Sequence, residues 1–239
     1  MTYQINQLLN RVIDFVLPPR CVNCGSTGVV LCVDCVKLVS FIEEPVCEIC
    51  GEPLRKKGLC ARCQENVLSI HKIRAAVYFR DPIPNIIHQF KYHNVFALAD
   101  ALSDLMHQQW FSWFAHVDLI IPIPLHKNRF QERGYNQSTL LARPLARKIK
   151  AQFNEPVLKR VTYTQPQAQL TALEREANVR NVFEITDKKI VRDKHVLLVD
   201  DVCTTGATLD SAAQALLNCG ASQVSAYCLS RASNKRLNA

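Results

Sequence analysis

Residues 195–209 read HVLLVDDVCTTGATL, and this stretch decides the fold. Its apolar run 196–199 is typical of a buried strand in a parallel sheet. Two carboxylates, Asp200 and Asp201, close the run, and a loop of small hydroxyl residues leads into a helix expected over 209–217. A strand, a small-residue loop and a helix N-terminus together indicate an anion site, because backbone N–H groups and the helix dipole point at one place.

The loop itself carries groups that suit a phosphate. Thr204, Thr205 and Thr208 offer hydroxyl donors, and Gly206 lets the backbone approach a ligand closely. The preceding aspartates can accept hydrogen bonds from sugar hydroxyls or hold Mg²⁺. An ordinary acidic strand end is the plain alternative, but two aspartates followed by Thr-Thr-Gly-x-Thr form a more specific pattern.

This pattern closely resembles the signature of type I phosphoribosyltransferases, which bind phosphoribosyl pyrophosphate (PRPP). The resemblance implies that Asp200 and Asp201 face the ribose hydroxyls. It also implies that the 5′-phosphate is wrapped by Thr204, Thr205, Gly206, Ala207 and Thr208. Hypoxanthine-type enzymes have an aspartate where Thr204 stands, and a threonine cannot act as a general base near neutral pH. Purine salvage is therefore not predicted.

Eight of the eleven cysteines fall into four C-x2-C pairs, which are Cys21/Cys24, Cys32/Cys35, Cys47/Cys50 and Cys60/Cys63. Each pair can bring two thiolates to one metal ion in a tight turn. Gly25 and Gly51 directly follow the first and third pairs, where such a turn favours positive φ. The spacing predicts two structural Zn²⁺ sites, most simply by joining the pairs in sequence, and an interleaved arrangement stays open.

Disulfides and redox-active C-x2-C motifs are the alternatives to zinc. We find no signal peptide before the cysteines, and Cys203, Cys219 and Cys228 lie in what reads as an ordinary α/β domain. These features favour a reducing, cytoplasmic environment. Because four pairs occur so close together, the sequence favours metal over redox chemistry.

The chain has 239 residues, which suffice for a full α/β core and a small module. We predict an N-terminal helix plus double zinc ribbon over residues 1–70 and a phosphoribosyltransferase-like domain over residues 71–239. The helix is expected within 5–17, and a short linking helix over 36–42. We find no apolar run long enough to span a membrane.

Strands alternating with helices predict a mostly parallel sheet, with ligands at the carboxyl ends of its strands. Strands are expected over 73–79, 117–123, 196–200 and 223–229, and further helices over 86–92, 96–114 and 135–150. Trp110 and Trp113 are expected in the core, although exposed tryptophans could stack on bases. Arg231, Lys235 and Arg236 are expected to form a disordered basic tail.

The net charge of +8 is concentrated in residues 125–160, which hold nine basic and two acidic side chains. This segment follows a predicted strand end and so shares a rim with the loop described above. Arg129 and Arg133 suit pyrophosphate, because a guanidinium can bind two oxygens at once. Solvated surface charges are the alternative reading. Lys91 is a weaker candidate for the same role.

Three motifs together resemble the ComF/GntX family, competence-associated phosphoribosyltransferase-like proteins with N-terminal zinc ribbons. They are Pro-x-Pro-Leu-His at 122–126, Arg-x-x-x-Arg-Gly-Tyr-Asn-Gln at 129–137 and Asp-Asp-Val-x-Thr-Thr-Gly-Ala-Thr at 200–208. Residues 165–183 match the family's pattern near a mobile loop over the active site. The resemblance implies a cytosolic bacterial protein that handles imported single-stranded DNA, alongside a helicase-like translocase. It implies no particular acceptor.

Two classes of function fit these features. In the first, an enzyme binds PRPP with Mg²⁺, and Asp200, Asp201 and Arg133 are its candidate catalytic residues. Arg129 and Arg133 would hold the pyrophosphate, while a nucleophile attacks C1. In the second, a nucleic-acid-binding module binds the phosphates of single-stranded DNA through the ribbons and the 125–160 segment, and the PRPP pocket senses a ligand.

Overall fold

The computed structural model describes residues 18–93, 95–161 and 182–232. The helix expected at 5–17, nearly all of the segment 165–183, and Lys235 and Arg236 lie outside these residues. The helices and strands, in chain order, are α2 (Val33–Lys37), α3 (Ala61–Glu65), β1 (Lys72–Tyr78), α4 (Ile83–Tyr92), α5 (Leu98–Trp113), β2 (Leu119–Pro122), α6 (Lys127–Arg133), α7 (Gln137–Ile149), β3 (Gln152–Phe153), β4 (Leu158–Arg160), β5 (Phe183–Ile185), α9 (Lys188–Val191), β6 (His195–Cys203), α10 (Ala207–Asn218) and β7 (Gln223–Arg231).

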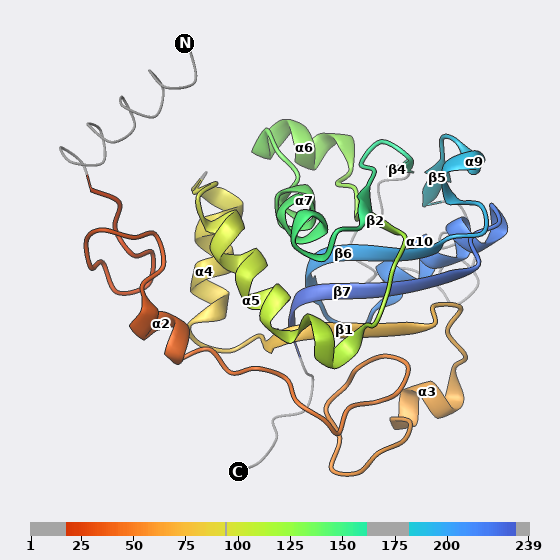
Figure 1. Cartoon of the computed structure of the whole chain (residues 1–239), viewed down its shortest axis with the longest axis horizontal. Coiled ribbons are helices and arrows are strands. Elements are labelled where there is room, and N and C mark those ends of the chain that lie inside the picture. Colours follow the sequence, from red (N-terminus) through yellow and green to blue (C-terminus); the bar gives the residue numbers. More distant parts are fainter. Residues whose placement is uncertain (1–17, 94, 162–181, 233–239) are drawn as a thin grey trace, which may run out of the picture.

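A five-stranded parallel sheet with the order β1-β7-β6-β2-β3 forms the centre of the molecule. Helices α5 and α7 lie on one face of this sheet and α10 on the other (Figure 1). The apolar run 196–199 of β6 is fully buried between these layers. Covering helices on both faces explain why the run is continuously apolar rather than alternating. The predicted α/β fold class is confirmed.

Strand β6 is longer than its apolar run predicts. It continues through Asp200 and Asp201 to Cys203, because β7 runs beside it and Cys203 pairs with Arg231. The two aspartates therefore lie within the strand, not after it. Arg231 is the last residue of β7 and only 2% exposed, so the prediction that it belongs to a disordered tail is wrong.

The predicted linking helix over 36–42 is also wrong. Helix α2 ends at Lys37, and the following segment is extended along the outer edge of β1. There the Tyr78 N–H donates to Ser40 O at 2.9 Å, and the Ile42 N–H donates to Ala76 O at 2.9 Å. The segment covers the exposed polar backbone of an edge strand, which would otherwise invite pairing with another chain.

Most other expected elements are present with shifted ends. Strand β2 is shorter than predicted, and α7 continues through Pro144. The sequence did not predict helices α3, α6 and α9, strand β3 or the antiparallel β4–β5 pair. Trp110 and Trp113 are buried, as expected for core residues. Among the described residues, no helix is both long and apolar enough to cross a bilayer.

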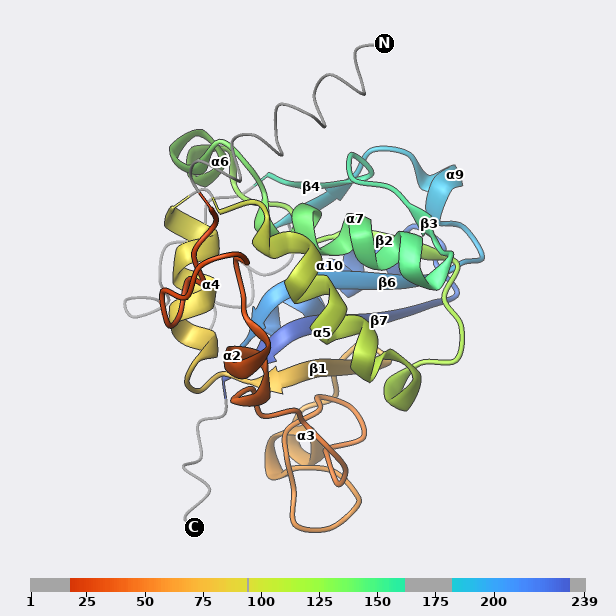
Figure 2. The ribbon, with the colours of Figure 1, turned by 60° about the vertical axis from the view of Figure 1, so that its left-hand side comes forward.

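The two cysteine-rich loops contact different parts of the sheet domain (Figure 2). The first, which contains α2, lies beside α4, where Asn85 Nδ2 donates to Val22 O at 3.2 Å. The second, which contains α3, lies under β1, where the Ile73 N–H donates to Ile49 O at 2.7 Å. Each loop is thus fixed to the sheet domain by its own backbone contacts.

Candidate functional site

The eight paired cysteines gather in two clusters, and each cluster joins consecutive pairs. One cluster contains Cys21, Cys24, Cys32 and Cys35, and the other contains Cys47, Cys50, Cys60 and Cys63, with the sulfurs of each cluster within 4.8 Å of one another. The Sγ atoms of Cys24 and Cys32 are 3.6 Å apart, and those of Cys50 and Cys60 are 3.5 Å apart. A tetrahedral zinc with Zn–S bonds of about 2.3 Å needs similar spacings. All eleven cysteines are free in this structure, and two compact groups of four sulfurs fit metal ions better than a disulfide framework.

The local backbone is shaped for thiolate ligands. The Cys32 N–H points at Cys21 Sγ at 3.4 Å, and the Cys60 N–H points at Cys47 Sγ at 3.4 Å. Such N–H groups stabilise metal-bound sulfur and orient it. Gly51 has a φ of +71°, and a Cβ there would lie 2.4 Å from Ile73 O, so the turn beside β1 requires glycine. These four-sulfur clusters fit structural zinc.

The loop after β6 forms an open cradle at the carboxyl edge of the sheet. Gly206 is the N-cap residue of α10 with a φ of +82° and has no side chain to cap the helix, while Thr205 Oγ1 accepts the Ala207 N–H at 3.4 Å. A Cβ on Gly206 would lie 2.7 Å from Ile73 Cδ1 and would push that side chain aside, and the positive φ itself favours glycine. The surrounding Thr204, Thr205, Ala207 and Thr208 are exposed. Backbone N–H groups at a helix N-terminus, flanked by hydroxyls, suit an anion.

Asp200 and Asp201 lie beside this cradle in different surroundings. Asp200 Oδ1 accepts the hydroxyl of Ser138 at 2.8 Å and the N–H of Asp201 at 2.9 Å. Burial and, as the second cause, the charge of the neighbouring Asp201 together raise the pKa of the Asp200 carboxyl to about 7. Asp201 Oδ2 forms an ion pair with Lys91 Nζ at 2.6 Å, and both side chains are mostly buried.

Two contributors to this site were missed or underrated from the sequence. Ser138 was not identified, although it directly follows the Gly-Tyr-Asn-Gln motif at 134–137. That motif does start a helix, because Asn136 Oδ1 accepts the Ser138 N–H at 3.1 Å and so places Ser138 in the first turn of α7. Lys91, treated as the weaker cation candidate, contacts the aspartate pair directly.

The two arginines favoured from the sequence lie on α6, at the rim of the site. Arg133 donates to the hydroxyl of Tyr92 at 3.1 Å, and its guanidinium lies 4.9 Å from the centre of that ring. Its Nη1 is buried and has no hydrogen-bond partner within the part of the chain that the structure describes. Arg133 is therefore a half-buried cation with one unsatisfied donor, whereas Arg129 is exposed.

A further cation, Arg160 at the end of β4, lies near the same rim. Burial lowers the pKa of Arg160, the charge of Arg129 lowers it further, and the charge of Asp200 opposes both. Arg160 is therefore close enough to interact electrostatically with both Arg129 and Asp200. Its position in the basic 125–160 segment was the only sequence signal for it, because the β4–β5 pair that carries it was not predicted.

The raised pKa of Asp200 predicts a pH-dependent stability. The folded state binds this proton more tightly than the unfolded chain, whose carboxyl has its ordinary pKa, so the stabilising contribution is complete below pH 4 and lost as pH rises toward 7. Asp200→Asn keeps an oxygen for Ser138 and cannot ionise. We expect it to stabilise the protein by about 1–2 kcal/mol at pH 8 and by little at pH 4.5, as measured by denaturant unfolding. An equal effect at both pH values would contradict this account.

Comparisons with known proteins agree with this architecture. The chain matches a double zinc ribbon domain over residues 12–64 and a phosphoribosyl transferase domain over residues 136–238. DNA utilization protein YhgH of Escherichia coli K12 is 32% identical over 195 residues, which cover 79% of this chain and 85% of the relative. Competence protein F of Haemophilus influenzae is 30% identical over 224 residues, which cover 89% of this chain and 97% of the relative.

More distant similarities include competence protein ComFC of Bacillus subtilis, which is 27% identical over 84% of each chain. Among solved structures, the glutamine PRPP amidotransferase of B. subtilis aligns with 56% of this chain and 26% of its own, at 20% identity and a TM-score of 0.41. Two four-cysteine clusters, a parallel sheet of this kind and relatives aligned over most of their length show that the chain belongs to the ComF family of phosphoribosyltransferase-like proteins with a double zinc ribbon.

Proposed function

We propose that this chain binds PRPP with Mg²⁺ at the carboxyl edge of its sheet and acts in natural competence, as a cytoplasmic protein that handles imported single-stranded DNA. One observation carries the first part of the proposal. The glycine-capped N-terminus of α10, with its exposed hydroxyls, directly follows the strand that carries Asp200 and Asp201, and Asp201 pairs with Lys91. The competence role is supported by the names of the relatives, competence protein F and competence protein ComFC.

Each part of PRPP has a chemically matched neighbour in this proposal. The loop 204–208 would bind the 5′-phosphate through backbone N–H groups and threonine hydroxyls. Asp200 and Asp201 would accept hydrogen bonds from the ribose hydroxyls. Arg129 and Arg133, together with Mg²⁺, would hold the pyrophosphate. Lys91 pairs with Asp201 at 2.6 Å, and ribose or Mg²⁺ at Asp201 would release it toward a phosphate oxygen.

Turnover would require an acceptor nucleophile that attacks C1 as the bond from C1 to the pyrophosphate oxygen breaks. Asp200, Asp201 and Arg133 would then act by positioning and by stabilising charge in the transition state. Thr204 stands in the loop where a general base would be useful, and its hydroxyl cannot supply one near neutral pH. We therefore propose PRPP binding as the primary property and leave the acceptor unassigned.

Titration of the zinc-loaded protein with Mg-PRPP by calorimetry tests the proposal. We expect micromolar binding to the wild type and roughly tenfold weaker binding to Arg133→Met, because the variant loses a charge-assisted contact worth about 1.4 kcal/mol. Arg143→Met is the matched control, since Arg143 is an exposed arginine that pairs with Glu155 at 3.3 Å. Absence of binding to the wild type would refute PRPP binding.

A second candidate function is direct binding of single-stranded DNA at the rim of the same site. Tyr92 and Phe130 are large aromatic side chains with exposed fractions of 58% and 47%. Arg133 stacks on Tyr92, and it lies one helical turn after Phe130 on α6. Exposed aromatic rings interleaved with cations are typical of surfaces that stack bases and contact phosphates without sequence preference.

Charge reversal tests the DNA-binding surface. In fluorescence anisotropy with an oligothymidine, we expect Arg129→Glu/Arg133→Glu to weaken binding at least tenfold and to reduce its salt dependence, because fewer counterions are released. Arg143→Glu/Lys148→Glu reverses the same number of charges elsewhere in the basic segment. If both double variants lose affinity equally, DNA binding depends on overall charge. If Arg129→Glu/Arg133→Glu loses no affinity, this surface is excluded as the DNA-binding site.

A further inference from the structure

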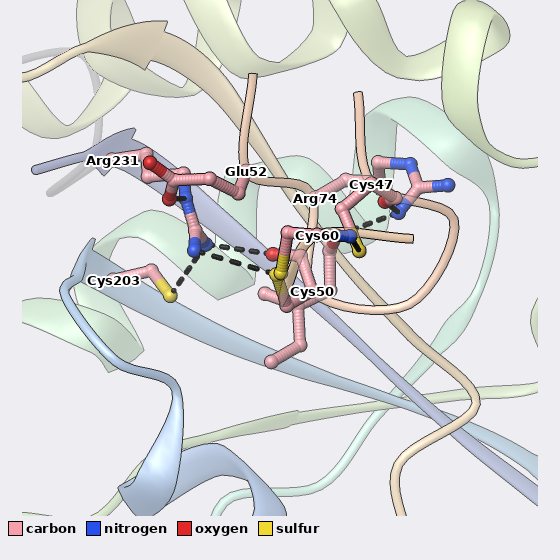
Figure 3. Close-up of polar contacts among 8 residues, drawn as sticks. Cys47, Cys50, Glu52, Cys60, Arg74, Cys203 and Arg231 are labelled. Atoms are coloured by element: carbon pink, nitrogen blue, oxygen red, sulfur yellow. Dashed lines mark hydrogen bonds and ion pairs between the residues drawn. The ribbon is translucent and has the colours of Figure 1, made fainter. Parts of the chain in front are cut away.

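Arg231 joins the second zinc ribbon to the end of the signature strand β6 (Figure 3). Its Nη1 donates to Cys50 O at 2.7 Å and contacts Cys203 Sγ at 3.2 Å. Its Nε donates to Glu52 Oε2 at 2.9 Å, and its Nη2 lies 3.8 Å from Cys50 Sγ. A single buried guanidinium thus contacts a zinc-ligating cysteine and the residue that immediately precedes Thr204.

Charge explains why an arginine is buried here. Zinc with four thiolates carries two net negative charges, and Glu52 adds a third beside the second cluster. Arg231 and Arg74 supply positive charge, and Arg74 Nη1 donates to Cys47 O at 3.3 Å. A buried guanidinium is stable only when its donors are satisfied and its charge is balanced. The negative charge that stabilises the buried guanidinium of Arg231 is therefore present when the second cluster holds zinc.

Two further sets of contacts link the phosphate loop and helix α10 to residues that adjoin the same ribbon. The Ile73 side chain packs against Gly206, while its N–H donates to Ile49 O in the ribbon at 2.7 Å. Asp210, in the first turn of α10, accepts the N–H groups of Ser69 at 2.7 Å and Ile70 at 3.0 Å. Ser69 and Ile70 come shortly after the second ribbon in the chain.

We propose that Arg231 is a positioning residue that couples zinc in the second ribbon to the conformation of the phosphate-binding loop 204–208. The second zinc ribbon is then part of the PRPP site, whereas the first ribbon is not. This inference rests on the proposed PRPP binding. Coupling is reciprocal, so zinc in the second cluster strengthens PRPP binding, and bound PRPP retains zinc in that cluster.

The first test follows zinc release to an excess of a colorimetric chelator. At equilibrium with the chelator, we expect saturating Mg-PRPP to raise the apparent affinity for one of the two zinc ions roughly fivefold or more, the lower range of typical coupling. Arg231→Met should abolish this protection, and Arg231→Lys should restore it in part by keeping the charge. Arg74→Met is the matched control, because Arg74 contacts the same ribbon through Cys47 O and Glu48 O but does not contact Cys203.

The second test needs no PRPP and uses one zinc-ligand variant for each ribbon. Hydrogen exchange of residues 203–208 should accelerate in Cys60→Ser and stay unchanged in Cys24→Ser. If exchange accelerates only in Cys60→Ser but the wild type binds no PRPP, the proposed function is refuted and the coupling between the ribbon and the loop is kept. PRPP binding with equal exchange in both variants, or with equal protection of both zinc ions, would overturn the coupling and keep the proposed function.

Discussion

The Asp200→Ala/Asp201→Ala variant is expected to bind Mg-PRPP at least a hundredfold more weakly than the wild type, and so to give no measurable heat in calorimetry. In the proposed site both carboxylates accept hydrogen bonds from the ribose, and hydrogen bonds to charged groups each contribute about 1.5–3 kcal/mol. Their loss also leaves the Lys91 ammonium without its partner at 2.6 Å. The expected effect is therefore larger than that of any single arginine at the rim.

Two controls separate lost binding from lost folding. Asp34→Ala/Asp104→Ala removes two surface carboxylates whose side chains are 88% and 67% exposed, and it should bind Mg-PRPP like the wild type. Unfolding of the Asp200→Ala/Asp201→Ala variant at pH 8 should show a folded protein, because burial already disfavours the ionised Asp200. Retained binding within threefold would place the ribose of PRPP somewhere other than this edge.

Local patterns in the sequence predicted the centre of the fold well. The apolar run 196–199 predicted a buried parallel strand, because both sheet faces are covered by helices. Four C-x2-C pairs predicted two thiolate clusters, because two thiols three positions apart reach one metal. Both predictions depend on interactions among neighbours in the chain, and for that reason they needed no knowledge of tertiary structure.

The failures concern residues whose role depends on distant partners. Arg231 is followed by a polar, basic stretch and so resembled a solvated tail, yet its partner Glu52 is 179 residues away in the chain. Residues 36–42 suggested a helix, whereas Ser40 and Ile42 pair with the backbone of an edge strand. Lys91 was underrated because nothing near it in sequence shows that α4 brings it to Asp201.

Removal of zinc is expected to have the largest effect on stability. The second ribbon has a satellite core made only of its own ligands Cys47, Cys50 and Cys63, with a few half-buried apolar side chains around them. A core of this size cannot fix the backbone of a loop without metal. Zinc in comparable small modules contributes about 10 kcal/mol or more, so we expect the metal-free ribbon to unfold.

Metal analysis and thermal unfolding of the two ligand variants test this expectation. The wild type should hold two zinc ions per chain, and Cys24→Ser and Cys60→Ser should each hold one, because the clusters form from consecutive pairs. Cys60→Ser should lower the melting temperature more than Cys24→Ser, since Cys21 and Cys35 of the first ribbon also pack into the main core. Loss of both zinc ions from either variant would contradict independent sites. A larger destabilisation by Cys24→Ser would contradict this order. It would mean that zinc matters more for the packing of the first ribbon beside α4 than for the contacts of the second ribbon with β1 and β7.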